Sequence, residues 1–264
     1  MDIDLQLVLN KVRMLVKETG AFIRTEGRQF NKEMIEYKGF NDLVSYVDKQ
    51  AEIQLTNTLQ KILPKAGFVT EEGTISKTGK AFTWIVDPLD GTTNFAHGLP
   101  VFAISIGLMH HDEIVLGVVY EINRDECFYA ISGKSACCND ATIHVSAETR
   151  LSGALLATGF PYNNFEKLPA YFRLLNSFMQ TTHGLRRMGS AAVDLVYVAC
   201  GRFEGFFEYN LNAWDVSAGA FIVQQAGGKV TDFSGGNNYI FGNEIAAACG
   251  VHHEMISVIQ KHWN

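Results

Sequence analysis

The 264-residue sequence predicts a layered fold of α-helices and β-sheets. In the N-terminal quarter, apolar residues recur at the three-to-four-residue spacing of amphipathic helices. After Phe68, short runs rich in β-branched and aromatic residues predict strands, and helical patterns return in the C-terminal half. No internal repeat, charge block or low-complexity tract marks a linker, so we expect one domain over residues 1–264.

The expected helices and strands follow in order along the chain. Helical spacing covers residues 5–30 and 43–63, and Pro64 ends the second helix because the residue before a proline avoids the helical conformation. The expected strands lie at 67–70, 83–86, 101–109, 113–120 and 126–131, and several are hairpin neighbours. Helices are expected again at 169–179, 191–199, 214–225 and 253–262, with short strands at 203–209 and 228–233 between them.

Composition argues against several classes of partner. The formal net charge of −6 speaks against nonspecific binding to nucleic acid or to an anionic membrane surface. No apolar run approaches the roughly 20 residues of a membrane-spanning helix, and the first residues lack the positive region of a signal peptide, so we expect a soluble, cytoplasmic protein. The five cysteines include no pair with the spacing of a zinc or redox site, so we expect small buried side chains or free thiols.

The run WIVDPLDGTTNF at 84–95 joins a buried strand to a turn that carries two acids. Pro88 biases Asp87 toward an extended conformation and Gly91 permits a tight turn, so Asp87 and Asp90 can converge on one point. Two close carboxylates repel each other unless one is protonated or a cation lies between them. Because all ligands would be oxygen atoms, we expect Mg²⁺, or Mn²⁺, rather than Zn²⁺.

Residues 92–94 have the character of a first helical turn, whose free N–H groups would face the same point as that of Gly91. A metal ion together with N–H donors suits a phosphate group. The alternative is a capped turn in which the two aspartates only accept hydrogen bonds from the local backbone.

Three further acids lie at the ends of predicted elements. Glu71 and Glu72 follow the strand at 67–70, and taken alone they indicate a solvated strand end. Asp215 begins an Ala- and Gly-rich helix, where the helix dipole stabilises a carboxylate without any ligand. The residue pattern by itself leaves these roles open.

Three separated segments resemble the inositol monophosphatase family. The run DPLDGTTNF at 87–95 is similar to the first signature of that family, and WDVSAG at 214–219, continuing to AGG at 226–228, is similar to the second. Glu71 and Glu72 stand where the family places a metal-binding glutamate pair. The resemblance runs from about Asp42 to the C-terminal helix. It implies an α/β sandwich with alternating αβαβα layers, a homodimer and sensitivity to lithium.

The resemblance also implies a set of metal ligands. Glu71, Asp87 and the Leu89 carbonyl would hold one Mg²⁺, and Asp87, Asp90 and Asp215 would hold a second. A third, weaker ion would use Glu71. A carboxylate shared between two ions, as Asp87 would be, brings both close enough to contact one phosphate group.

The implied activity is Mg²⁺-dependent hydrolysis of myo-inositol 1-phosphate or a related polyol or sugar monophosphate. One ion lowers the pKa of a water molecule, and Thr92, supported by Asp48, orients this water for attack on phosphorus. The N–H groups of Gly91 and Thr92 bind the phosphate oxygens, and Glu72 tunes the network.

For the polyol, the resemblance implies that Asp90 and Glu208 accept hydrogen bonds from hydroxyl groups and that the backbone near Ala191 donates one. The alternative for Glu208 is a carboxylate at a strand edge. Arg186 and Arg187 have the forked geometry that matches phosphate, but we expect them at an interface or in a structural role.

Other functions remain as alternatives. The run at 87–92 superficially matches phosphatases that use an aspartyl nucleophile in an Asp-x-Asp-x-Thr motif, but its acids are one residue too far apart. Within the same fold, the substrate could be fructose 1,6-bisphosphate, histidinol phosphate or a 3′-phosphonucleotide. A non-catalytic regulatory protein that keeps the fold is the alternative from a different class, and the intact acidic set argues against it.

Overall fold

The computed structural model describes residues 3–30, 35–39, 42–75, 77–79, 81–162 and 164–263. Within these residues the helices are α1 (Leu5–Gly27), α2 (Tyr46–Ile62), α3 (Thr92–His97), α4 (Leu168–Thr181), α5 (Ala191–Ala199), α6 (Ala213–Gln225) and α7 (His252–Trp263). The larger sheet contains, in spatial order, β3 (Gly67–Thr70), β4 (Phe82–Asp90), β5 (Ala103–His110), β6 (Glu113–Glu121), β7 (Glu126–Ile131), β8 (Cys137–Cys138) and β9 (Ala141–Thr142). The smaller sheet contains β11 (Gly184–Arg186), β10 (Leu155–Thr158), β12 (Gly205–Tyr209), β14 (Glu244–Ala248) and β13 (Lys229–Thr231). β1 (Ile35–Gly39) and β2 (Asp42–Ser45) form an antiparallel pair.

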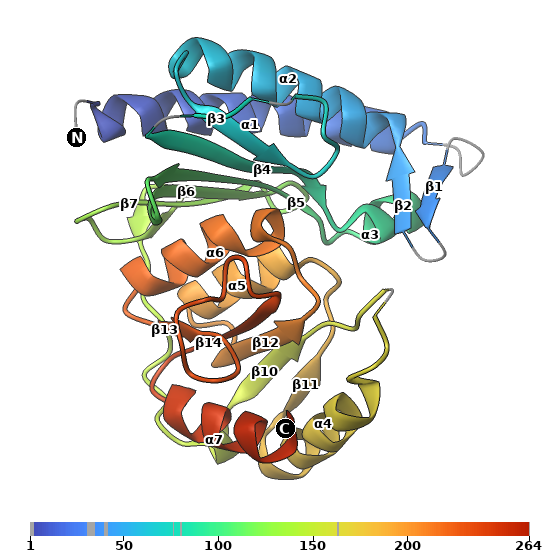
Figure 1. Cartoon of the computed structure of the whole chain (residues 1–264), viewed down its shortest axis with the longest axis vertical. Helices are drawn as coiled ribbons and strands as arrows, with labels where there is room; N and C mark the ends of the chain where they lie inside the picture. Colours follow the sequence, from blue (N-terminus) through green and yellow to red (C-terminus); the bar gives the residue numbers. More distant parts are fainter. Residues whose placement is uncertain are drawn as a thin grey trace.

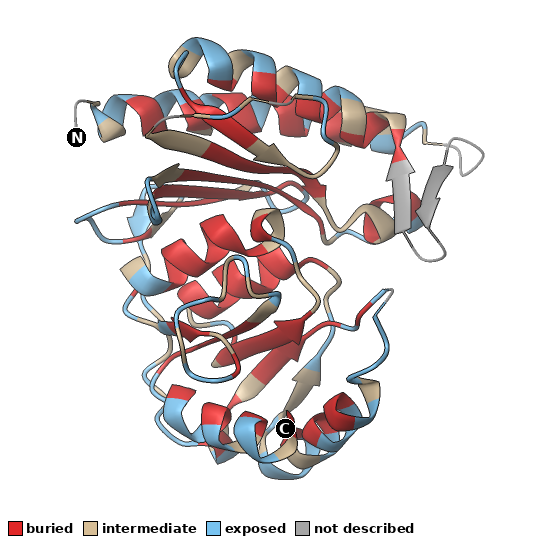
Figure 2. Cartoon of the chain, in the orientation of Figure 1, coloured by how far each residue is buried: buried red, intermediate tan, exposed pale blue. Residues whose placement is uncertain are grey.

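Figure 1 shows how these elements are layered. α1 and α2 cover one face of the larger sheet, and α5 and α6 lie between its other face and the smaller sheet. α4 and α7 cover the far face of the smaller sheet. Buried residues concentrate in the sheets and in the two middle helices (Figure 2). The order helix, sheet, helix, sheet, helix confirms the expected αβαβα sandwich.

Most expected elements are present, but the second helix begins later than its apolar spacing suggests. Residues 42–45 form β2 instead of helix. Ser45 is extended (φ −121°, ψ 166°), and its hydroxyl accepts a hydrogen bond from the Val47 N–H at 3.1 Å. Asp48 Oδ2 in turn accepts from the Ser45 N–H at 2.9 Å, which completes a capping box and sets the start of α2 at Tyr46. Among the described residues, no helix has the length and apolar composition needed to span a membrane.

A β-bulge near the end of β4 determines where its acids point. In a regular strand, residues three positions apart face opposite sides of the sheet. Asp87 pairs with Ser105 and Asp90 with Ala103, so β4 contains one extra residue between the two acids. Because Ser105 and Ala103 are two positions apart, the bulge places both aspartates on the same face. Pro88 lies inside the bulge, where its missing N–H removes nothing from the ladder.

The middle helix α6 approaches the larger sheet very closely. Gly107 of β5 and Gly117 of β6 are paired across the sheet and face this helix. A methyl group at Gly117 would lie 2.8 Å from the carbonyl oxygen of Ala218 in α6. The Ser105 hydroxyl also donates to the Trp214 carbonyl at 3.2 Å. These contacts fix the first turn of α6 beside the bulge of β4.

We predict that Gly117→Ala lowers the free energy of unfolding by about 1–3 kcal/mol, because the added methyl group meets helix backbone that cannot rotate away. Gly107→Ala is the matched control: its methyl group would meet the Ser217 hydroxyl, a side chain that can rotate and that has no hydrogen-bond partner in the described part of the chain. Urea unfolding of both variants measures the difference. Equal losses in the two variants would contradict this account of the helix position.

Candidate metal centre and substrate cavity

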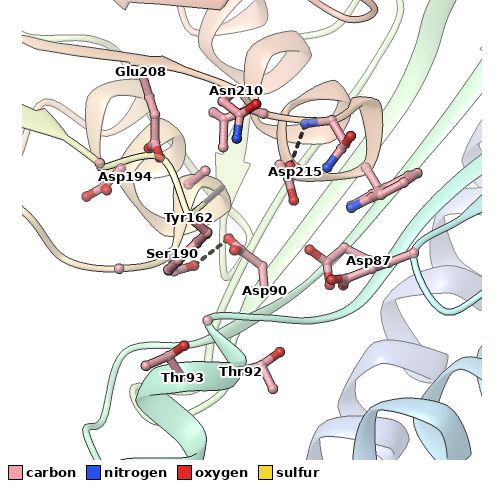
Figure 3. A pocket seen from close by; sticks show the side chains of 18 of the residues that line it. Asp87, Asp90, Thr92, Thr93, Tyr162, Ser190, Asp194, Glu208, Asn210 and Asp215 are labelled. Atoms are coloured by element: carbon pink, nitrogen blue, oxygen red, sulfur yellow. Dashed lines mark hydrogen bonds between the residues drawn. The ribbon is translucent and has the colours of Figure 1, made fainter. Parts of the chain in front are cut away.

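A cavity of about 310 Å³ lies where the end of β4 meets the first turns of α5 and α6. Of the residues expected to form the site, nine line it: Glu71, Asp87, Leu89, Asp90, Gly91, Thr92, Ala191, Glu208 and Asp215. Asp48 and Glu72 lie outside the cavity lining. Figure 3 shows Asp87, Asp90 and Asp215 grouped together, with Glu208 and Asp194 on the side away from Asp87. The fold therefore brings together acids that are far apart in the sequence.

Three carboxyl groups form the centre of the cavity. One oxygen from each of Asp87, Asp90 and Asp215 lies within 4.8 Å of the other two. Asp87 is only 1% exposed, and the other two are half-buried. The bulge in β4 brings the first two acids together, whereas α6 supplies Asp215 at its third residue, where its carboxylate accepts from the Asn212 N–H at 2.6 Å.

Burial and mutual repulsion raise the pKa values of these acids. The pKa of Asp87 is raised well above its ordinary value, first by burial and then by the charges of Glu71, Asp90 and Asp215. The pKa of Asp215 is also raised well above its ordinary value, mainly by burial and then by the charge of Asp90. Burial raises the pKa of Asp90 to about 6, although its hydrogen bonds oppose the shift. At neutral pH this arrangement needs protons or a cation to balance its charge.

The donor set fits a hard divalent cation. Its atoms are the carboxylate oxygens of the three aspartates, Leu89 also lines the cavity, and no cysteine or histidine among the described residues does so. Oxygen-only ligands are typical of Mg²⁺ and Mn²⁺ rather than of Zn²⁺. A hydrogen bond between Glu71 and Asp87 extends the acidic set beyond the three aspartates. A cation at this position would replace the shared protons that such close carboxyl groups otherwise require.

Asp48 reaches the site through Thr92. The Thr92 hydroxyl lies 2.8 Å from Asp48 Oδ1 and 3.0 Å from the Leu89 carbonyl oxygen. Since a hydroxyl has one proton to donate, these two acceptors fix its direction and leave the oxygen free to accept from another group in the cavity. Asp48 is fully buried, and the same carboxyl group caps α2 through Ser45. The cap therefore also holds the threonine in place.

A buried glutamate that sequence reasoning missed holds the segment that carries Glu71 and Glu72. Glu52 of α2 is fully buried, and its carboxylate accepts from the N–H groups of Glu72 and Thr74, each at 2.7 Å. The Thr74 hydroxyl adds a third bond at 2.7 Å. The sequence contains one signal for this role: Glu52 is an acid on the apolar side of an expected helix. These bonds fix the backbone beside Glu71, which lines the cavity. They also hold Glu72 next to Glu71, although Glu72 itself does not line the cavity.

The turn after β4 requires glycine. Gly91 has φ 98° and ψ 33°, and it caps the short helix α3. A methyl group there would also lie 3.0 Å from the Val101 carbonyl oxygen and 3.3 Å from that of Gly189. The glycine therefore permits both the left-handed turn and the close approach of the segment before α5. The first turn of α3 follows directly, so Thr92 and Thr93 enter the cavity wall as expected.

Asp90 joins the two halves of the cavity. Its Oδ2 accepts from the Ser190 hydroxyl and from the Ala192 N–H, both at 2.6 Å, and the Ala191 N–H also bonds to this carboxylate. Ser190 caps α5, so the first turn of this helix presents its N–H groups to the acid of β4. Ala191 thus lines the cavity, and its N–H group is bonded to Asp90.

The far side of the cavity contains Glu208 and several residues that the sequence analysis did not assign to it. Burial raises the pKa of Glu208 to about 8, while the charge of Arg187 lowers it. Arg187, expected at an interface or in a structural role, lines the cavity and donates to the Tyr162 hydroxyl at 2.9 Å. Asp194 also lines it. The sequence contains a signal for this placement: Asp194 follows Ala191 by three residues on one expected helix, so the two residues lie on the same side of it.

Comparisons with known proteins agree with this geometry. The profile of the inositol monophosphatase family matches residues 4–264. The chain is 42% identical over 211 residues to the Nus factor SuhB of Escherichia coli K12, which covers 80% of this chain and 79% of that protein. The crystal structure of the extragenic suppressor protein suhB from Bartonella henselae has a TM-score of 0.91 and 38% identity, covering 97% of this chain and 99% of that one. Staphylococcal SaIMPase-II, solved with bound inositol monophosphate, has a TM-score of 0.81 and 26% identity, covering 97% and 95%.

We predict that the effect of Mg²⁺ on stability grows with pH. The pKa values of Asp90 and Glu208, about 6 and about 8, lie above those of unfolded acids, so the folded chain binds more protons than the unfolded chain in that range. Without metal, its free energy of unfolding therefore falls as the pH rises from about 5 to about 8. A cation that replaces the protons should reverse this loss.

The measurement is the melting temperature between about pH 5 and pH 8, with Mg²⁺ or with chelator at equal ionic strength. We expect the melting temperature in chelator to fall with rising pH and the increase caused by Mg²⁺ to become larger. An increase of the same size at both ends of the range would mean that the acids do not exchange protons for metal.

Proposed function

Because this chain belongs to the inositol monophosphatase family, we propose that it hydrolyses a polyol or sugar monophosphate, such as myo-inositol 1-phosphate, with Mg²⁺. The observation that carries the proposal is the convergence of three carboxyl groups within 4.8 Å in the wall of a cavity whose other side contains a buried Glu208. The inositol monophosphate bound to the related SaIMPase-II supports the choice of substrate.

We assign the metal ligands on the same basis. Glu71, Asp87 and the Leu89 carbonyl would hold one ion, and Asp87, Asp90 and Asp215 a second, while a third, weaker ion would use Glu71. When bound, Mg²⁺ supplies a Lewis acid that lowers the pKa of water and offsets negative charge on the departing oxygen. Mn²⁺ fits the same oxygen ligands.

The protein groups orient the reactants. The Thr92 hydroxyl, fixed by Asp48 and the Leu89 carbonyl, accepts a hydrogen bond from the attacking water and holds it in line with phosphorus. The backbone N–H groups at Gly91 and in the first turn of α3 bind the phosphate oxygens. Glu72, whose backbone is held by Glu52, acts on this network from outside the cavity lining.

The other half of the cavity would bind the carbon skeleton of the substrate. Glu208 is buried on β12 and lines the cavity, so its carboxylate can accept a hydrogen bond from a substrate hydroxyl. Asp90 lies between the two halves, which allows it to serve a metal ion and a hydroxyl at once. The backbone near Ala191, a residue of the cavity lining, would donate a hydrogen bond to the same part of the substrate.

Family membership also supports a homodimer, sensitivity to lithium and a cytoplasmic location as further proposals. For the dimer there is a local observation: Phe172 and Met179, seven positions apart on α4, are 57% and 60% exposed. Such a spacing places both apolar side chains on one side of the helix. Sedimentation velocity of the purified chain tests this proposal, and a monomer at all concentrations would reject it.

A second candidate function is that of a Nus factor. The relative from Escherichia coli, 42% identical to this chain, carries that name. Such a role would be carried by the outer surface of the protein and not by the chemistry of the cavity. It differs from the non-catalytic regulatory alternative considered from the sequence, because it would accompany catalysis and not replace it.

To test catalysis, phosphate release is measured from myo-inositol 1-phosphate, fructose 1,6-bisphosphate, histidinol phosphate and 3′-phosphoadenosine, with Mg²⁺ and with chelator. We expect Mg²⁺-dependent release with a preference for the inositol ester. Asp90→Asn keeps the side-chain volume but removes charge at the metal centre. Its turnover should fall by more than the roughly 10- to 100-fold typical of losing an outer hydrogen-bond partner of a metal ligand.

Preference for another ester would change the assigned substrate and leave the metal chemistry in place. Normal turnover in Asp90→Asn would reject the assignment of the site. No release from any of the four esters by the unmodified chain would reject the proposed activity on these substrates.

To test the Nus-factor role, the chain is expressed in Escherichia coli that lacks its own SuhB. We expect the chain to restore the lost Nus-factor activity. The Asp90→Asn variant should restore it equally, because this substitution lies inside the cavity and leaves the outer surface unchanged. Failure of both proteins, each shown to be expressed and folded, would reject this role.

A further inference from the structure

One carboxyl group in the cavity has no role in the function proposed above. Asp194 of α5 lines the cavity and is only 1% exposed. Its Oδ1 is buried and has no hydrogen-bond partner within the described part of the chain. Figure 3 shows Asp194 beside Glu208, on the side of the cavity away from Asp87.

A buried carboxyl oxygen without a hydrogen-bond partner is costly. Transferring such a group from water to a protein interior is unfavourable unless hydrogen bonds replace those lost to water. Asp194 lies in the first turn of α5, where the helix dipole favours an acid, but an exposed acid would gain the same stabilisation without losing its hydration. The dipole therefore does not explain why the group is buried. A ligand in the cavity that donates a hydrogen bond would explain it.

The surroundings of Asp194 restrict what this ligand can be. Its charged neighbours within the described residues are the acids Glu208 and Asp90 and the cation Arg187. Negative charge thus predominates on this side of the cavity. A second phosphate group on the substrate would face two buried carboxyl groups with one arginine nearby, which is unfavourable. Hydroxyl groups suit either protonation state, because a carboxylate accepts from them and a carboxylic acid both donates and accepts.

We propose that Asp194 is a second recognition residue for the carbon skeleton of the substrate, and that Asp194 and Glu208 together bind neighbouring hydroxyl groups of a polyol monophosphate. This inference rests on the proposed phosphatase function and narrows it. The pair selects substrates whose far end is uncharged and rich in hydroxyl groups, and it disfavours bisphosphates. Asp194 is not one of the proposed metal ligands, so we assign it to recognition of the carbon skeleton and not to the metal chemistry.

The test compares two ligands that occupy different parts of the cavity. The Michaelis constant for myo-inositol 1-phosphate depends on contacts at both ends of the cavity. The inhibition constant of inorganic phosphate depends only on contacts at the metal end. Asp194→Ala should raise the Michaelis constant relative to the inhibition constant about tenfold, which corresponds to one lost hydrogen bond. Asp194→Asn should raise it less. Asp194→Asn should also increase the rate with fructose 1,6-bisphosphate relative to the inositol ester, because the substitution removes a negative charge.

Asp112→Asn is the control, since it changes an exposed acid in the turn before β6. It should leave the ratio of the two constants and the preference between the two esters unchanged.

Stability distinguishes recognition from a structural role. If Asp194 serves the substrate, the ligand-free Asp194→Asn variant should melt at the same or a higher temperature than the unmodified chain, because a neutral side chain replaces a buried acid that has one unpaired oxygen. The proposal would be overturned if the Michaelis constant and the inhibition constant changed in parallel, or if neither changed. It would also be overturned if the variant melted at a lower temperature and lost affinity for all ligands equally. Absence of phosphate release by the unmodified chain would instead reject the function on which the inference rests.

Discussion

The rest of the cavity depends on the burial and close approach of Asp87, Asp90 and Asp215. Each of these acids would be stable alone at the surface, but the fold holds one oxygen of each within 4.8 Å of the others and buries Asp87 almost completely. The cost of burial, and after it the cost of repulsion, appears as raised pKa values of Asp87 and Asp215. Other features of the fold keep the acids in place against this repulsion. The bulge in β4 turns two of them to one face, and the bond from the Asn212 N–H to Asp215 fixes the third.

Helix starts do much of this positioning. Asp48 caps α2 and at the same time orients Thr92, while Ser190 caps α5 and donates to Asp90. Asp215 accepts the backbone N–H that precedes α6. In each case, one side chain satisfies the free N–H groups of a helix end and also contributes to the cavity. The local rules that begin the helices therefore also assemble the site, and few of these residues can change without affecting both.

Local patterns were sufficient to predict much of the fold. Long amphipathic helices and strongly β-branched strands such as β4 to β6 have clear periodicity, and the acids at 71, 87, 90 and 215 belong to recognisable segments. Prediction failed where context decides. β10 has only four residues and β14 is rich in alanine, and both are strands because of their neighbours in the smaller sheet. The burial of Glu52 and Asp194, and the place of Arg187 in the cavity wall, depend on which surfaces pack together.

The cavity lies between the layers, and its two ends come from different parts of the chain. The metal end is built mainly from residues 71–92, with Asp215 added from α6, whereas the far end comes from residues 159–210. These parts can therefore change at different rates during evolution. Substitutions in the second part could adapt the same hydrolytic chemistry to new metabolites without disturbing the acids. Conversely, the cluster could decay while the exterior is preserved by selection, so that descendants of one ancestral phosphatase keep its shape for unrelated work.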